Sequence, residues 1–245
     1  MKKVVEIDNI TKSYEKKLKI FFSTLFGKTD AHSDENTVLH KISLSFFESE
    51  IIGIVGKNGA GKSTLLKLIS GILKPTTGTV KITGRIASLL ELGSGFNHNF
   101  TGRENVYLYS KVLGFSNTKI KDEIDDIIEF SGLGEFISLP IKTYSEGMSA
   151  RLIFSILTSI SHDCLAIDEG FGTGDSDFFE RAEKRMKSFM NSSGTLILAS
   201  HSEHLLKQFC TRGIVFNHGQ VVYDGSLDAS LNYYHTHDYI HSNDN

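Results

Sequence analysis

Short apolar runs alternate with amphipathic segments along this chain and predict its central sheet. Residues 51–55, IIGIV, form a continuous apolar run that is typical of a strand buried on both faces, and a helical leucine pattern follows it across a glycine-rich loop. Cys164–Ile167 and Thr195–Ala199 are two further short apolar runs, and a charged helical pattern over Phe178–Met190 separates them. Strands that alternate with helices indicate an α/β fold around a largely parallel sheet.

Other segments predict a smaller sheet and a group of helices beside this core. Residues 2–8 and 42–48 alternate apolar and polar positions with period two, which is typical of an antiparallel sheet. A turn then leads into a strand over Thr79–Ile82. Two amphipathic stretches within 101–136 predict a helical subdomain, and helical periodicity resumes over Ser145–Ile160.

An amphipathic insert interrupts the predicted antiparallel sheet at residues 15–37. Its apolar residues recur at helical spacing and are flanked by lysines. Such a segment can lie on a membrane surface or dock on a partner, or its aromatic residues can pack on the chain's own small sheet. The apolar positions are Leu18, Phe21, Phe22, Leu25 and Phe26.

The chain end from Asn232 is rich in His, Asn and Asp and shows no apolar period, so we expect it to fray, with residues 236–245 as a flexible tail. Its histidines, His235, His237 and His241, could hold a metal ion, but an incidental polar tail is the simpler interpretation.

Composition narrows the class of protein without identifying it. A net charge of -3 and a pI near 6.4 provide no basic surface for nucleic acid. Cys164 and Cys210 are the only cysteines and predict reduced thiols in the cytoplasm. Glu6 and Asp8 interrupt any signal core, and no apolar stretch approaches the roughly 20 residues of a spanning helix.

The glycine-rich loop after the first buried run carries the strongest chemical signal. It satisfies the pattern G-x-x-x-x-G-K-[ST] and lies between a predicted strand and a predicted helix, where the motif cradles phosphates on backbone N–H groups. Lys62 is expected to reach the β- and γ-phosphates of ATP, and the Ser63 hydroxyl to ligate Mg²⁺. The loop consists of Gly56, Lys57, Asn58, Gly59, Ala60, Gly61, Lys62, Ser63 and Thr64.

A second half of the site is predicted at the end of the apolar run Cys164–Ile167. Asp168 and Glu169 follow it at the carboxyl end of a strand, where ligands bind in open α/β sheets. Asp168 is placed to hold the Mg²⁺ shell and Glu169 to orient the water that attacks the γ-phosphate. An acidic pair at a strand end is otherwise a common helix start.

Residues 144–151, YSEGMSAR, resemble the signature segment of ABC ATPases. Taken alone, Ser145 with Glu146 is a helix cap. The resemblance implies that Ser145 and Gly147 grip the γ-phosphate of ATP on an opposite subunit. Glu146 and Met148 depart from the usual signature, which leaves the detail of that contact open.

Four further positions are carried over from the same resemblance. It implies that His201 contacts the γ-phosphate, that Asp175 lies at a dimer seam and that Tyr14 stacks on adenine, although Tyr14 could equally be an ordinary edge-strand tyrosine. Glu91 stands where most ABC ATPases have a glutamine near Mg²⁺.

The sequence LLELGSGF, the TGREN segment, the YSEGMSAR signature and the insert together resemble the ATP-binding subunits of bacterial polysaccharide exporters. The resemblance implies a single ABC ATPase domain over residues 1–235, with a RecA-like core, an antiparallel β-subdomain and a helical subdomain at about 96–160.

It also implies a homodimer that binds ATP and Mg²⁺ and works with a transmembrane permease at the cytoplasmic face of the inner membrane. The expected cargo is lipid-linked O-antigen, with capsular polysaccharide or teichoic acid as alternatives. The permease is expected to handle the polysaccharide. The rival interpretation is a soluble ABC ATPase of DNA repair or translation, but such proteins usually carry two cassettes or a long coiled coil.

Overall fold

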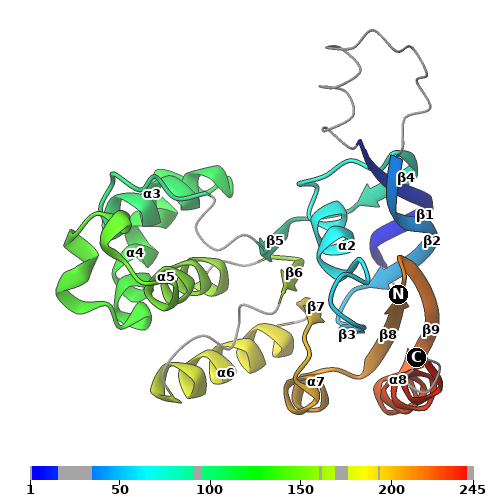
Figure 1. Cartoon of the computed structure of the whole chain (residues 1–245). Helices are drawn as coiled ribbons and strands as arrows, with labels where there is room; N and C mark the ends of the chain where they lie inside the picture. Colours follow the sequence, from blue (N-terminus) through cyan, green and yellow to red (C-terminus); the bar gives the residue numbers. More distant parts are fainter. Residues whose placement is uncertain are drawn as a thin grey trace, which may run out of the picture.

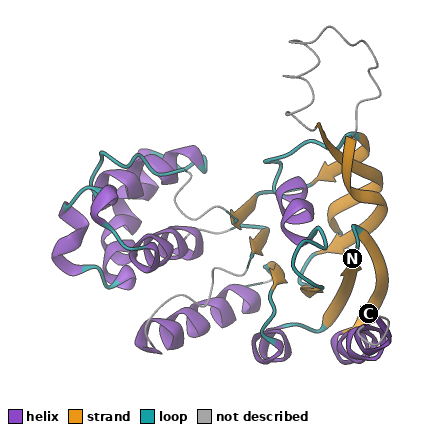
Figure 2. Ribbon diagram, in the orientation of Figure 1, coloured by secondary structure: helices purple, strands orange, loops and turns teal. Residues whose placement is uncertain are grey.

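Two sheets with helices packed on them form the computed structural model of the chain (Figures 1 and 2). The larger sheet has six strands in the order β5-β6-β7-β3-β8-β9, of which all but β9 run parallel. Its strands are β3 (Ile51–Val55), β5 (Ile86–Leu89), β6 (Cys164–Ile167), β7 (Thr195–Ala199), β8 (Arg212–Asn217) and β9 (Gln220–Ser226). The structure describes residues 2–15, 35–90, 95–159, 162–168, 176–192 and 194–241.

The smaller sheet is antiparallel and has three strands. They are β1 (Lys3–Glu15), β2 (Glu35–Phe47) and β4 (Thr77–Ile82), in the order β2-β1-β4. Alternate residues of β1 and β2, among them Val5, Ile7 and Phe46, are buried. The period-two pattern of the sequence therefore indicates that one face of this sheet packs on the core.

Helix α2 (Lys62–Ile69) lies between the two sheets (Figure 1). Leu65 and Leu66 are fully buried and belong to one apolar cluster with residues of β1, β2 and the six-stranded sheet. Each apolar side chain of this size contributes about 1.5–3 kcal/mol when it is buried. This packing fixes the helix, and with it the loop that precedes it.

The opposite face of the large sheet is covered by helices α6 (Ser176–Asn191), α7 (Glu203–Phe209) and α8 (Leu227–His241). Leu165 and Ile167 of β6 pack on this side, whereas Cys164 and Ala166 pack on the side of α2. Both faces of the sheet are covered, which explains why its strands read as continuous apolar runs.

A helical segment projects from the edge of the large sheet beyond β5 (Figure 2). It contains α3 (Gly102–Val112), α4 (Asn117–Ser131), two 3-10 turns, η1 (Gly134–Ser138) and η2 (Ile141–Thr143), and α5 (Glu146–Ser159). Thr101 begins α3 with a reciprocal capping box, since its side chain accepts from the Glu104 N–H and the Glu104 carboxylate accepts from the Thr101 N–H. Gly132, with φ of 65°, ends α4.

Arginines and phenylalanines join this segment to α6. The Arg185 guanidinium of α6 lies 4.3 Å from the ring centroid of Phe130 and donates to Asp126 at 2.6 Å, both on α4. Arg181 donates to the Phe130 carbonyl oxygen at 3.1 Å, and Phe130 and Phe178 pack edge to face. Because cation–π contacts and hydrogen bonds are directional, they fix the orientation of α6 against α4 as well as its distance.

The sequence predicted most of these elements, and the structure confirms the buried strands, the small antiparallel sheet, α2, α3, α4, α5 and α6. It extends the first two predicted strands to Glu15 and back to Glu35, so the predicted insert shrinks to residues 16–34, which lie outside the described residues. The expectation of an irregular chain from Asn232 is wrong, because α8 continues to His241. The Tyr223 ring of β9 stacks on Tyr233 of this helix and provides packing that periodicity alone does not reveal.

Both cysteines are free and buried. Burial raises the pKa of the Cys164 thiol to about 12 and that of the Cys210 thiol to about 12. Thiols with such values carry almost no thiolate at neutral pH and react slowly. Within the described parts of the chain, the structure contains no helix with the length and apolar character to cross a membrane.

The junction between the helical segment and the sheet contains a partly buried imidazole, that of His162. Burial lowers its pKa from 6.5 to about 4, and the nearby positive charges of Arg85 and Lys119 act in the same direction, while Asp163 and a hydrogen bond to Leu157 oppose them. The unfolded chain therefore binds more protons than the folded chain between these two pH values.

We expect the free energy of unfolding to fall by about 2 kcal/mol from this residue alone when the pH is lowered from 7 to 5. Stability conferred by the neutral imidazole is present above pH 6.5 and is lost as the pH falls towards 4. Urea unfolding of wild type and of His162→Phe at both pH values measures the effect. The variant should lose about that part of the pH dependence, whereas His98→Gln, which leaves His162 in place, should retain it; an equal slope in all three proteins would contradict the assignment.

Candidate nucleotide-binding site

The loop between β3 and α2 is held by close backbone packing on both sides. Gly61 has φ of 105°, and a Cβ there would lie 2.6 Å from Leu39 Cδ2 of β2. A Cβ at Gly56 would lie 2.4 Å from the carbonyl oxygen of Phe216 in β8. Glycine is therefore required at both ends of the loop, at one end for its conformation and at the other for the close approach.

Lys62, the first residue of α2, turns its ammonium group back over this loop. The side chain is only 5% exposed, and its Nζ donates to the carbonyl oxygens of Gly56 at 2.7 Å and Lys57 at 3.1 Å. A buried cation held at a helix N-terminus creates a local positive field that favours an anion.

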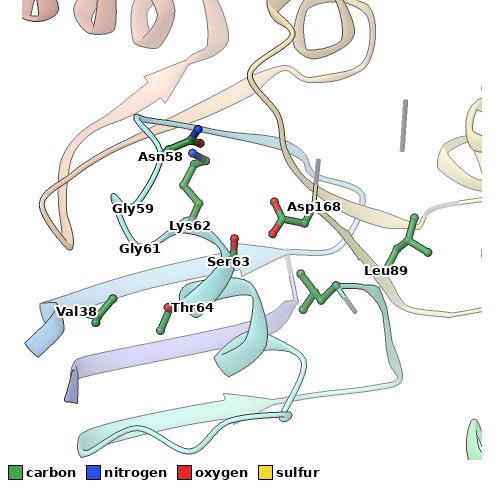
Figure 3. A pocket seen from close by; sticks show the side chains of 10 residues that line it. Val38, Asn58, Gly59, Gly61, Lys62, Ser63, Thr64, Leu89 and Asp168 are labelled. Carbon is green, nitrogen blue, oxygen red and sulfur yellow. The ribbon is translucent and has the colours of Figure 1, made fainter. Parts of the chain in front are cut away.

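A pocket of about 560 Å³ opens over the loop, within the range of small-molecule sites (Figure 3). Figure 3 shows the Lys62, Ser63 and Asp168 side chains around the same space. Asp168 enters from the carboxyl end of β6, two strands away from β3. The pocket is lined by Val38, Asn58, Gly59, Gly61, Lys62, Ser63, Thr64, Leu89, Leu90 and Asp168.

The donor set of this pocket fits a magnesium nucleotide. Mg²⁺ is usually held by one or two carboxylates together with substrate phosphates and water, rather than by a full cage of protein ligands. The Ser63 hydroxyl and the Asp168 carboxylate supply suitable hard oxygen atoms, and they lie beside the cationic Lys62. Among the described residues, no group of three or more His, Cys, Asp or Glu side chains forms a metal site of another kind.

His201 links the end of β7 to the same loop. Its Nε2 lies 2.6 Å from Asn58 Oδ1 and 3.4 Å from Lys62 Nζ. The structure therefore brings His201 together with the loop, although 139 residues separate it from Lys62 in sequence. An imidazole in this position can donate a hydrogen bond to an anion held on the loop.

The signature-like segment lies elsewhere. Ser145 begins α5 as a cap, because its Oγ accepts from the Met148 N–H at 3.2 Å and its carbonyl oxygen accepts from the Ser149 N–H at 3.0 Å. Ser145 is exposed and Gly147 is half-buried, and neither residue lines the pocket over the loop. Figure 1 shows α5 and α2 in separate parts of the molecule.

The remaining predicted site residues are not brought into the pocket by the described structure. Tyr14 is 41% exposed on β1, its ring faces Lys12 Nζ at 5.2 Å, and it is not among the lining residues. Glu91, Glu169 and Asp175 lie outside the described residues.

Sequence reasoning missed three apolar lining residues, Val38, Leu89 and Leu90. Val38 lies in the part of β2 between the predicted insert, residues 15–37, and the predicted strand at 42–48, and Leu89 ends β5, a strand that was not predicted. The mostly apolar segment 86–90 is the sequence feature that could have indicated β5. It is too short to identify a strand without knowledge of its pairing with β6.

The fold and the site define a nucleotide-binding protein of the P-loop class, with a phosphate loop between β3 and α2 and an acidic residue at the end of β6. The protein-family model described as "ABC transporter" matches residues 39–172, which is more than half of the chain. The chain belongs to the ABC transporter family of ATP-binding proteins.

The chain is also similar to individual proteins of this family. It is 41% identical over 192 residues to the O-antigen export system ATP-binding protein RfbE of Yersinia enterocolitica, covering 78% of this chain and 80% of RfbE. It is 39% identical over 221 residues to the teichoic acids export ATP-binding protein TagH of Lactococcus lactis, covering 89% of this chain and 47% of TagH. It is also 42% identical over 197 residues to the ABC transporter protein AbcA of Aeromonas salmonicida, covering 80% of this chain and 64% of AbcA. The chain thus spans about half to two thirds of the length of TagH and AbcA.

A solved structure with the same fold is the dimeric, post-hydrolysis state of the ATP-binding cassette MJ0796 bound to ADP and Pi. The TM-score is 0.74 at 20% identity, with 91% of this chain and 98% of that chain covered. The likeness confirms the predicted ABC ATPase fold.

Replacing Lys62 with methionine tests the phosphate loop. The variant keeps the length of the side chain but removes its charge, so we expect ATP affinity to fall about 10- to 100-fold, the usual loss of a hydrogen bond to a charged group. Titration with a fluorescent ATP analogue measures the change. Lys67→Met, in the last turn of the same helix, is the matched control, and equal affinity in the two variants would contradict the role of Lys62.

Proposed function

We propose that this chain is the ATP-hydrolysing subunit of a bacterial polysaccharide exporter and that it works as a homodimer beneath a transmembrane permease. The observation that carries the proposal is the separation of the phosphate loop from the segment around Ser145 within one chain. Each site is incomplete by itself, and a second copy supplies what is missing.

Nucleotide binding follows from the pocket over the loop. The loop N–H groups and the Lys62 ammonium hold the β- and γ-phosphates, and Ser63 and Asp168 hold Mg²⁺, which neutralises phosphate charge when bound. The apolar lining around Val38 and Leu90 excludes water from one side of the nucleotide. We retain Tyr14 as the candidate for stacking on adenine, although it lies outside this lining.

The hydrolytic roles rest on the residue order after β6 and β7. Glu169 acts as the general base that orients the attacking water, and Lys62 and His201 stabilise the charge that develops on the γ-phosphate. The contact between His201 and Asn58 supports this role, because it already places the imidazole beside the loop. From the family resemblance we assign Glu91 to the surroundings of Mg²⁺ and Asp175 to the seam between protomers.

The dimer is supported by the exposed start of α5. The first N–H groups of a helix attract anions, and those of α5 open on an exposed serine and a half-buried glycine. A twofold arrangement of two copies would place Ser145 and Gly147 of each protomer over the phosphate loop of the other. Two nucleotides would then be clasped between the protomers.

The contacts between α6 and α4 supply a route from the site to the helical segment. Helix α6 follows residues 169–175, and its Arg181 and Arg185 bind Phe130 and Asp126 on α4. A shift at the start of α6 on hydrolysis would therefore move the helical segment, which we assign to contact with the permease.

The cargo is inferred from the relatives. Their names include O-antigen export and teichoic acid export, both of which are polysaccharide pathways. We favour lipid-linked O-antigen, with capsular polysaccharide or teichoic acid as alternatives. The net charge of -3 and the single phosphate loop favour transport over a nucleic-acid function.

Replacing Glu169 with glutamine should lower ATP turnover about 10²- to 10⁴-fold, the usual contribution of a general base, while ATP remains bound. In that background we expect disulfide formation between Asn58→Cys and Glu146→Cys of two protomers, seen as a covalent dimer only when ATP is present. The buried Cys164 and Cys210 do not interfere.

The matched control pairs Asn58→Cys with Asp125→Cys, an exposed position on α4. That pair should remain monomeric under the same conditions. ATP turnover equal to wild type in Glu169→Gln would overturn the assignment of the base, and a failure of residues 58 and 146 to crosslink in any trapped complex would overturn the dimer.

Export is tested in the bacterium that carries this chain. Deleting its gene should remove the surface polysaccharide and leave lipid-linked polymer inside the cell. Wild type supplied in trans should restore export and Glu169→Gln should not, because binding without turnover cannot complete the transport cycle. Unchanged surface polysaccharide in the deletion strain would contradict the function, and the composition of the retained polymer would identify the cargo.

A further inference from the structure

A second pocket lies on the other side of the phosphate loop, between the end of β8 and helix α8. Its volume is about 340 Å³, within the range of small-molecule sites. Helix α8 packs beside β8, where Ser230 Oγ donates to the Gly213 carbonyl oxygen at 2.7 Å. Among the residues that the structure describes, none lines both pockets, so this one is distinct from the nucleotide site.

The chemistry of the pocket favours an anion. Its described polar lining consists of Lys57, Asn217, His218 and His237 together with two tyrosines, Tyr233 and Tyr234, and none of these described lining residues is acidic. Lysine is cationic, and asparagine, histidine and tyrosine all carry groups that can donate hydrogen bonds. A ligand that presents a carboxylate, sulfonate or phosphate group complements this set.

An ordered column of rings forms one wall and favours a flat ligand. Tyr233 stacks on Tyr223 with ring centroids 4.9 Å apart and on His237 with centroids 3.8 Å apart. His237 Nδ1 donates to the Tyr233 carbonyl oxygen at 3.0 Å, which fixes the orientation of its ring. Rings held in this way pack against a planar aromatic ligand with little further loss of side-chain freedom.

The turn between β8 and β9 brings a histidine to the pocket. His218 and Gly219 have φ of 44° and 72°, so the two-residue loop has both central residues in the left-handed region. Asparagine and glycine are favoured at the first position of such a turn. Histidine is one of the residue types enriched among non-glycine residues in this region, and His218 is among the described residues that line the pocket.

The pocket shares a wall with the phosphate loop. Lys57 lines this pocket, while its carbonyl oxygen accepts from Lys62 Nζ at 3.1 Å on the nucleotide side. Phe216, which also lines the pocket, abuts Gly56 closely enough that a Cβ there would lie 2.4 Å from its carbonyl oxygen. A ligand in this pocket would therefore contact the same short segment that positions Lys62.

We propose that this pocket binds a small planar anion, an aromatic ring that carries an acidic group, and that its occupancy changes the affinity of the phosphate loop for nucleotide. Binding in the pocket is independent of the proposed function. The effect on nucleotide affinity rests on it, because it requires that the loop bind ATP.

The probe is 2-naphthoate, titrated against the full chain without nucleotide. The chain contains no tryptophan, so the fluorescence of the probe can be followed with little background from the protein. We expect saturable binding that is weaker for 2-naphthol, which lacks the charge, and for cyclohexanecarboxylate, which lacks the aromatic ring. Lys67→Met, in the last turn of α2 and outside the described linings of both pockets, should bind the probe as wild type does.

Two variants test the residues. His218→Asn is compatible with the turn, and His237→Ala removes the end of the ring column. Each variant should fold, and its affinity for the probe should fall by about fivefold or more. His235→Ala, on the same helix and outside the lining, is the matched control and should bind as wild type does. Thermal melting confirms that each variant is folded.

The absence of saturable binding, or equal affinity in His218→Asn, His237→Ala and wild type, would overturn the site. ATP affinity is then measured with and without saturating probe, and we expect a change of about threefold or more. If the probe binds as expected but ATP affinity does not change, the link to the phosphate loop is overturned. A chain that binds the probe but no ATP would instead point to a failure of the proposed function.

Discussion

The burial of α2 between two sheets is the constraint on which the nucleotide site depends. Leu65 and Leu66 are completely buried, and the first residue of the same helix is Lys62. A helix packed on both sides cannot slide or tilt without opening voids in the core, and each lost contact of that kind costs free energy. The loop at its N-terminus therefore keeps its shape, with Gly61 pressed against β2 and Gly56 against β8.

The small antiparallel sheet has a role in the site that goes beyond support. Its strand β2 supplies Leu39, which requires a glycine at the end of the loop, and Val38, which lines the nucleotide pocket. The large sheet supplies Asp168 and His201 at the carboxyl ends of neighbouring parallel strands, β6 and β7. Since the ends of parallel strands meet at one edge, residues distant in sequence converge there.

The helical segment is joined to the rest of the molecule by contacts of a different kind. Aliphatic packing dominates around α2, whereas α6 meets α4 through Arg181, Arg185 and Phe130. Polar and cation–π contacts have preferred geometries, so a rotation of α6 must either carry α4 with it or break them. The phosphate loop likewise has two sides, since the Lys57 carbonyl oxygen accepts from Lys62 Nζ and Lys57 also lines the pocket beside α8.

The sequence alone determined the chemistry of the loop and the strands that flank it, because each of these signals is local. The pattern around Gly56 and Lys62 requires only a strand, a turn and a helix in order, and continuous apolar runs identify strands that are covered on both faces. Only the tertiary structure decided that His201 reaches Asn58, that Val38 lines the pocket while Tyr14 does not, and that the chain continues as a helix past Asn232. These features depend on contacts between segments far apart in the chain, and neither periodicity nor spacing records which segments meet.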